Sequence, residues 1–207
     1  DITSKNIISK NMRASAVLIA KCPGIVCGIE IFKKVFLKLN KSFTFDVLKE
    51  DGQKVKKGDI ILTMEGPAYH LLCGERTALN FIQKLSGIAT TTNKFVNIVK
   101  NTTAHIYDTR KTIPGFRHLS KYAVRCGGGK NHRMCLEDMV LIKDNHLKLI
   151  DVLTKKVQEI RKKHKGILIQ VECENKKHVQ DALNAKVDLI MLDNMKKGLL
   201  VKMIKFI

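Results

Sequence analysis

The second half of the chain alternates short apolar segments with amphipathic segments of helical period, and this alternation constrains the fold more than any other feature. The apolar segments, which we expect to be β-strands, cover residues 104–107, 139–142, 167–173 and 187–192. Helices are expected between them, over residues 150–164 and 176–185. A strand that is followed by a helix and then by another strand is typical of a parallel sheet or an α/β barrel.

The first part of the chain has a different pattern. Short strands are expected over residues 14–20, 43–48 and 60–65, and the turn-rich segments between them favour antiparallel pairing. Apolar residues at helical spacing predict a helix over 29–39. A second helix is expected over 75–85, interrupted by Gly87 and followed by a similar pattern over 90–99. The first part therefore reads as a small unit of mixed α and β structure.

Cations collect in three short segments close to the predicted strands, at residues 108–111, 127–133 and 142–146. In parallel α/β folds, ligands bind at the carboxyl ends of the strands. Arg110, Lys143 and Asp193 fall at or just beyond such ends, and Glu172 lies within its strand. The residues alone thus predict a site for a ligand with several negative charges.

The net charge of +19 raises nucleic acid as an alternative partner. Most of the positive charge comes from lysines that are scattered or lie on expected helices, and only 5% of the residues are aromatic, with no tryptophan. The chain therefore has few aromatic side chains on which bases could stack, so we favour a solvated lysine-rich surface over a nucleic-acid partner.

Neither a membrane span nor a secretion signal is evident in the sequence. No apolar run approaches the roughly 20 residues that a membrane helix needs, and the start of the chain lacks the pattern of a signal peptide. The six cysteines form no CxxC pair and no Cys/His zinc spacing. We expect a cytoplasmic protein without membrane contact, whose cysteines are free thiols rather than metal ligands or disulfides.

Seven motifs then occur in a fixed order along the chain. They are ERTALN (75–80), LSGIAT (85–90), DTRKT (108–112), KYAVRCGGG (121–129), NHRM (131–134), LIKDNH (141–146) and MLDNM (191–195). Each motif is weak by itself, but the ordered set resembles the quinolinate phosphoribosyltransferase family, also called carboxylating nicotinate-nucleotide pyrophosphorylase. The resemblance extends from Asp1 to about Met195.

This resemblance implies a fold and an activity. The fold is an N-terminal α/β sandwich domain, expected over residues 1–79, followed over residues 80–207 by an incomplete α/β barrel that is C-terminally truncated relative to the family. The enzymes of this family are glycosyltransferases of the pentosyltransferase class that act in NAD biosynthesis. They join quinolinate to phosphoribosyl pyrophosphate, release pyrophosphate and carbon dioxide, leave nicotinate mononucleotide, require Mg²⁺ and work as dimers.

The resemblance also assigns roles to individual residues. Planar guanidinium groups suit a ring with two adjacent carboxylates, and the implied quinolinate pocket contains Arg110, His132, Arg133 and Lys143, with Arg76 contributed across a homodimer interface. Lys111 is implied to meet phosphate oxygens. Glu172 and Asp193 are the implied ligands of Mg²⁺, which prefers oxygen donors, and the implied catalytic residues are Lys111, Lys143, Glu172 and Asp193.

Two departures from the family pattern keep alternatives open. Gln170 stands where family members have the first of several alternating acids. The chain also stops at Ile207, before the segment that supplies the family's last barrel strands and its 5′-phosphate loop. We therefore expect either a part of a longer product or a weakly active remnant. The alternatives are a non-catalytic remnant that binds anionic ligands, a transferase that acts on another aromatic acid, and a basic nucleic-acid-binding protein.

Overall fold

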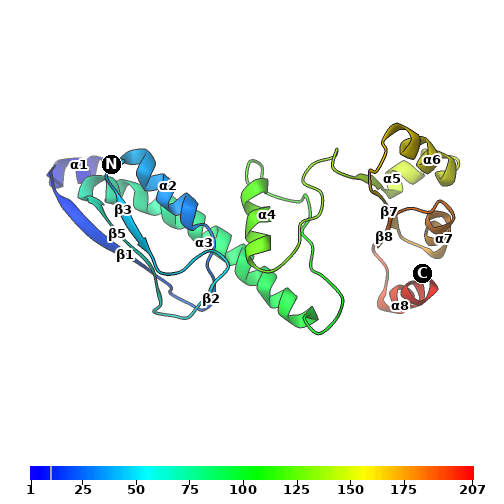
Figure 1. Ribbon diagram of the computed structural model, residues 1–207, viewed down its shortest axis with the longest axis horizontal. Helices are drawn as coiled ribbons and strands as arrows, with labels where there is room; N and C mark the ends of the chain where they lie inside the picture. Colours follow the sequence, from blue (N-terminus) through cyan, green and yellow to red (C-terminus); the bar gives the residue numbers. More distant parts are fainter. Residues whose placement is uncertain (10) are drawn as a thin grey trace. The chain divides into compact units, whose positions relative to one another are not determined.

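The computed structural model describes residues 1–9 and 11–207 (Figure 1). The chain divides into two compact units, Asp1–His132 and Arg133–Ile207. The domain boundary predicted between residues 79 and 80 falls inside helix α3 (Ala68–Val99) of the first unit, and it stays a prediction.

The first unit is built on a three-stranded antiparallel sheet in the order β1 (Arg13–Ile19), β5 (Ile60–Pro67), β3 (Thr44–Val47). A short helix α1 (Ile2–Ile7) precedes it, and β2 (Gly24–Ile25) pairs with β4 (Lys54–Val55) in a separate two-stranded ladder. Along β1, half-buried residues alternate with exposed ones, as expected for a strand with one face on a core. The antiparallel strands predicted from the sequence are confirmed.

Helices α2 (Ile29–Leu39) and α3 cover one face of this sheet (Figure 1). The bounds of α2 agree with the predicted helix because Ile29, Phe32 and Phe36 recur at helical spacing and are all buried. The ring of Phe36 packs at a tilt against that of Phe43, which immediately precedes β3, with ring centroids 5.3 Å apart. The main core of the first unit therefore lies between α2, α3 and the sheet.

Helix α3 is continuous for 32 residues, so the prediction that Gly87 interrupts it was wrong. A glycine in a helix interior costs only about 1 kcal/mol relative to alanine. Its neighbours Leu85 and Ala89 are fully buried against the segment after β2 and against helix α4 (Arg117–Cys126). Tertiary burial on both sides of Gly87 therefore outweighs the local preference for a break.

Two glycines near α3 are expected to respond oppositely to alanine. A Cβ at Gly127, just after α4, would lie 2.4 Å from the Ala89 carbonyl oxygen, whereas a Cβ at Gly87 would meet nothing within 4 Å. We expect Gly127→Ala to destabilise the protein by about 1–3 kcal/mol through overpacking, and Gly87→Ala to stabilise it by about 0.5–1 kcal/mol. Urea unfolding of both variants measures the difference, and equal effects would contradict the packing described here.

The second unit contains a parallel sheet in the order β6 (Val140–Ile142), β7 (Ile169–Cys173), β8 (Leu189–Leu192). The helices of this unit are α5 (Asp144–Leu147), α6 (Leu153–Lys163), α7 (Lys176–Asn184) and α8 (Lys197–Phe206). Strand β7 is central, and all of its residues are buried except the partly buried Glu172, as expected for a strand inside a parallel sheet. The strand–helix alternation predicted for this region is confirmed from β6 onward.

The predicted strand over residues 104–107 was wrong. In this segment the structure records only an isolated parallel bridge between Tyr107 and Lys130. Ala104 and His105 are exposed and only Ile106 is partly buried, so the segment has no apolar face long enough to hold a ladder. Within the described residues, no helix combines the length and apolarity that crossing a membrane requires.

Candidate functional site

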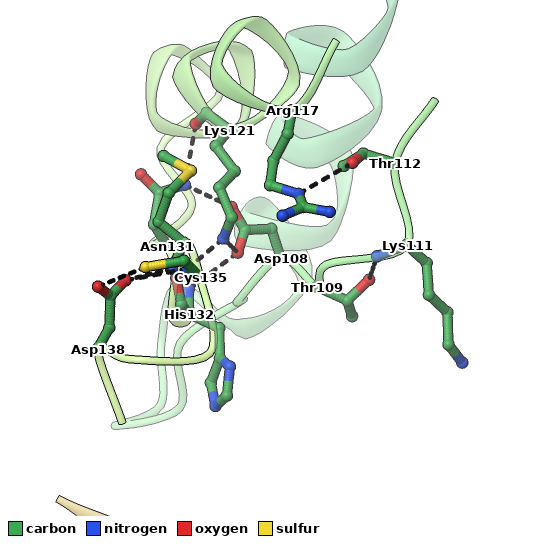
Figure 2. Close-up of polar contacts among 11 residues, drawn as sticks. Asp108, Thr109, Lys111, Thr112, Arg117, Lys121, Asn131, His132, Cys135 and Asp138 are labelled. Atoms are coloured by element: carbon green, nitrogen blue, oxygen red, sulfur yellow. Dashed lines mark hydrogen bonds and ion pairs between the residues drawn. The ribbon is translucent and has the colours of Figure 1, made fainter. Parts of the chain in front are cut away.

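A buried ion pair organises the end of the first unit (Figure 2). The Lys121 Nζ on α4 donates to Asp108 Oδ1 at 2.5 Å, and the side chains of Lys121 and Asp108 are only 1% and 7% exposed. The same ammonium donates to the His132 carbonyl oxygen at 2.8 Å. A charge this deeply buried must be paired and hydrogen-bonded, and both conditions are met here.

Besides the Lys121 ammonium, the Asp108 carboxylate accepts two hydrogen bonds from the segment 131–132. The His132 backbone N–H donates to Asp108 Oδ1 at 2.8 Å, and Asn131 Nδ2 donates to Asp108 Oδ2 at 2.5 Å. Asn131 also donates to the Lys121 carbonyl oxygen at 2.9 Å. The network fixes the start of the 108–112 loop next to His132, while the side chains of His132 and Lys111 point away from it (Figure 2).

Arg110 lies in this loop, two residues after the buried carboxylate. Its side chain is half-buried, and among the described residues its Nε has neither solvent contact nor a hydrogen-bond partner. A buried donor without a partner costs about 1–3 kcal/mol. Lys111 is exposed, and its backbone N–H donates to Thr109 Oγ1 at 3.1 Å. The loop therefore presents, next to each other in the sequence, a guanidinium nitrogen without a partner among the described residues and an exposed lysine.

In the second unit, three predicted site residues meet at the carboxyl edge of the parallel sheet. Lys143 follows β6, Glu172 is the penultimate residue of β7, and Asp193 follows β8. Ile142 pairs with Val171 and Cys173 pairs with Leu192, so the three side chains start from neighbouring positions on adjacent strands. The sequence prediction that these strand ends converge is thus supported by the strand register.

The electrostatics of this edge reflect its crowding. Desolvation raises the pKa of the Glu172 carboxyl, the adjacent Asp193 carboxyl raises it further, and the Lys143 ammonium lowers it. Two neighbouring carboxylates that repel each other next to one ammonium make a site that a divalent cation would complement. Glu172 and Asp193 therefore fit the oxygen-donor pair that Mg²⁺ would need.

The raised pKa of Glu172 gives a stability prediction. The folded state holds this proton more tightly than the unfolded state, so the favourable contribution is complete below the unfolded pKa of about 4.3 and is lost as pH rises through the higher folded value. At pH 7, Glu172→Gln should be more stable than the parent by less than about 1 kcal/mol, because solvent screens this half-exposed group. The gain should disappear below about pH 4.

A matched control is Glu159→Gln on α6. Hydrogen bonding to Lys156 lowers the pKa of Glu159, so its contribution is present above the unfolded pKa and is lost as pH falls. This variant should lose stability at neutral pH, the opposite sign from Glu172→Gln. Denaturant midpoints at acid and neutral pH test both, and a neutral-pH loss in Glu172→Gln would argue against the crowded carboxyl pair.

Local hydrogen bonds support two of the strand-end residues, Lys143 and Asp193. The Lys143 backbone N–H donates to His146 Nδ1 at 2.9 Å. Asn194 has a left-handed φ of 52° and its Nδ2 donates to Asp193 Oδ2 at 2.8 Å. Gln170, the position that departs from the family pattern, is 8% exposed and sits within the buried strand.

The other predicted residues are distributed over both units. Arg133 lies at the start of the second unit, where its Nη1 donates to the Met139 carbonyl oxygen at 2.9 Å. Arg76 is an exposed residue on α3 of the first unit. The structure therefore groups Arg110, Lys111 and His132 around one network, and Lys143, Glu172 and Asp193 around one sheet edge. The individual roles assigned to these residues stay predictions.

Sequence reasoning missed the residues that support the first group. Asp108, Lys121 and Asn131 all occur in the ordered motifs, but none was assigned a function. Asp108 and Lys121 are separated by 13 residues, so no local spacing rule links them. The one available signal was their presence in motifs next to Arg110 and His132.

The fold and these two groups of residues define an α/β protein that presents cations and paired acids at loop and strand ends, the arrangement of an enzyme for anionic substrates. The family model "Quinolinate phosphoribosyl transferase, N-terminal domain" matches residues 1–86, and "Quinolinate phosphoribosyl transferase, C-terminal domain" matches residues 88–207. The chain belongs to the quinolinate phosphoribosyltransferase family.

Individual relatives agree with this assignment. The chain is 41% identical to a probable carboxylating nicotinate-nucleotide pyrophosphorylase of Synechocystis, covering 94% of this chain and 66% of the relative. The corresponding protein of Bacillus subtilis is also 41% identical, with 94% and 67% covered. The solved nicotinate-nucleotide pyrophosphorylase of Francisella tularensis is 38% identical with a TM-score of 0.94, covering 100% of this chain and 73% of that one. The chain thus spans about two thirds of the length of these curated relatives.

Proposed function

We propose that this chain carries quinolinate phosphoribosyltransferase activity: transfer of a phosphoribosyl group to quinolinate with loss of carbon dioxide, giving nicotinate mononucleotide and pyrophosphate. The observation that carries the proposal is the meeting of Lys143, Glu172 and Asp193 at the carboxyl ends of three adjacent parallel strands. The family models match this chain over residues 1–86 and 88–207. The names of the curated relatives state the same reaction class.

The cations are proposed to bind and orient the ring. Arg110 offers a buried Nε that lacks a partner in the described structure, and a carboxylate of quinolinate would satisfy it. His132, Arg133 and Lys143 are proposed to complete the recognition of the two carboxylates, and Lys111 to contact phosphate. Holding the ring rigidly among fixed cations lowers the barrier because the charges need not reorganise during the reaction.

The two carboxylates are proposed to act on the departing pyrophosphate through a metal ion. Glu172 and Asp193 would hold Mg²⁺, which when bound neutralises charge on the departing pyrophosphate. Lys143 lies close enough to Glu172 to lower its pKa and so helps keep this carboxyl ionised for that role. Once the ring nitrogen carries the ribose it is cationic and accepts the electron pair left when carbon dioxide departs, so no organic cofactor is needed for decarboxylation.

The experiment that tests the proposal measures both binding and turnover. The purified chain is titrated with quinolinate, and nicotinate mononucleotide is then quantified after addition of phosphoribosyl pyrophosphate and Mg²⁺. We expect Mg²⁺-dependent product, reduced about 100-fold or more in Asp193→Asn. Binding without product would support the non-catalytic remnant instead, and absence of both would overturn the proposal.

A homodimer in which Arg76 serves the partner's site is the proposed assembly, and it is supported by the exposed position of Arg76 on α3. Arg76→Ala and Lys143→Ala should each be inactive alone. Mixing them should restore about a quarter of the parent activity, since half of randomly paired two-fold dimers are hybrids with one intact site. Size-exclusion chromatography checks the assembly, and failure of the mixture to regain activity while hybrids form would place Arg76 in its own subunit's site.

A further inference from the structure

Three potential metal ligands from distant parts of the sequence come together in the first unit. One ligand atom each from Cys27, Asp51 and Cys126 lies within 4.8 Å of the others. Cys27 is fully buried, and Asp51 and Cys126 are partly buried. Nothing in the proposed reaction uses these side chains.

The surrounding structure holds Asp51 and Cys27 in position. Asp51 Oδ1 accepts from the backbone N–H groups of Gly28 and Ile29 at 2.8 and 3.1 Å, at the start of α2. Its Oδ2 accepts from the Tyr122 hydroxyl at 2.8 Å. The Cys27 backbone N–H donates to Ser86 Oγ of α3 at 2.9 Å. Ligands that are positioned by their own hydrogen bonds are a recurrent property of metal sites.

The fixed geometry brings together groups that would repel each other when ionised. Burial raises the pKa of the Cys27 thiol well above its usual range, and the neighbouring Cys126 and Asp51 raise it further. A divalent cation would reverse this preference because it binds thiolates directly and displaces their protons. Two sulfur donors and one carboxylate oxygen suit a borderline-soft ion such as Zn²⁺, and they are a poor match for Mg²⁺, which prefers oxygen alone.

We propose that Cys27 Sγ, Cys126 Sγ and a carboxylate oxygen of Asp51 form a binding site for a thiophilic divalent cation of the Zn²⁺ type, with water as the fourth ligand. Binding would release the two thiol protons and form two metal–sulfur bonds and one metal–oxygen bond. Tyr122 would orient the carboxylate through its hydrogen bond. A bound ion would link the start of α2, the turn at Asp51 and the last residue of α4.

Zinc-binding measurements on the reduced, full chain test this site directly. Competition with a chromophoric chelator should show a single tight Zn²⁺ ion per chain, and Co²⁺ should give a sulfur-to-metal charge-transfer band with tetrahedral d–d absorption. Loss of this band is expected in Cys27→Ser and Cys126→Ser. Tyr122→Phe should weaken binding by about 10–100-fold, the usual cost of removing a group that orients a ligand.

Matched controls separate the site from general thiol chemistry. Cys22→Ser and Cys73→Ser remove thiols outside the cluster and should leave binding and the cobalt spectrum unchanged. Circular dichroism shows whether Cys27→Ser stays folded, and the partly exposed Cys126 provides an independent variant if it does not. Equal Zn²⁺ affinity in the parent and in folded Cys126→Ser, or formation of a Cys27–Cys126 disulfide in a parent chain that binds no Zn²⁺, would overturn the proposal.

Discussion

Replacing Lys121 with methionine is expected to destabilise the first unit by about 3–5 kcal/mol, the usual cost of removing one partner from a buried ion pair. The variant keeps most of the apolar stem but leaves the Asp108 carboxylate, which is only 7% exposed, without its counter-charge. It also removes the donor to the His132 carbonyl oxygen. Guanidinium unfolding followed by circular dichroism measures the loss.

A second substitution, at Asp108, shows whether the lost stability comes from the unpaired charge or from altered packing. Lys121→Met combined with Asp108→Asn removes both charges, so the double variant should recover a large part of the stability lost in the single one. A double variant that is as unstable as the sum of the two singles would show that the cost comes from packing around α4. As a surface comparison, Arg13→Met breaks the exposed pair with Glu65 and should cost about 1 kcal/mol or less.

Arg110→Lys is expected to weaken quinolinate binding by about 10–100-fold, which corresponds to the roughly 1.5–3 kcal/mol of hydrogen bonds to a charged group. Lysine keeps the positive charge but loses the planar fork that matches a carboxylate. Stability should stay the same or rise, because the substitution removes a buried Nε without a described partner. Isothermal titration and thermal unfolding of the same preparation measure the two effects.

Arg110→Lys is expected to lower the affinity for quinolinate without lowering the stability of the fold, and this combination makes the test specific. An arginine that only stabilises the fold would lose stability on substitution and would leave quinolinate affinity unchanged in the folded fraction. Arg13→Lys, at an exposed position of β1 in the same unit, is the matched control and should alter neither quantity measurably. Unchanged quinolinate affinity in Arg110→Lys would remove Arg110 from the proposed pocket.

Helices and strands whose structure is decided by the local spacing of apolar residues could be predicted from the sequence. Helix α2 matches its expected bounds because three buried apolar residues recur at helical spacing. The parallel strands β6, β7 and β8 were predicted from apolar runs bounded by turn signals, and their shared direction follows from the helices between them. Because all carboxyl ends lie on one edge of such a sheet, the meeting of Lys143, Glu172 and Asp193 followed from the order of the elements.

Features that depend on packing between distant segments could not be predicted. Continuity of α3 through Gly87 requires knowing that Leu85 and Ala89 are buried by other elements. The ion pair of Asp108 and Lys121 and the cluster of Cys27, Asp51 and Cys126 join residues whose sequence separations follow no motif. The free-thiol expectation for the cysteines came from their local spacing, which contains no information about such contacts.

The uninterrupted helix α3 also bears on how this family's two sequence domains can be separated. The family models meet near Gly87, in the middle of a helix that at 1.5 Å per residue is about 48 Å long. A protein divided there would expose the buried sides of Leu85 and Ala89 on two half-helices. The modules recognised in the sequence are therefore not autonomous parts that could be exchanged at that junction, and recombination between relatives should be tolerated better in the loops after Val99 than at the domain border.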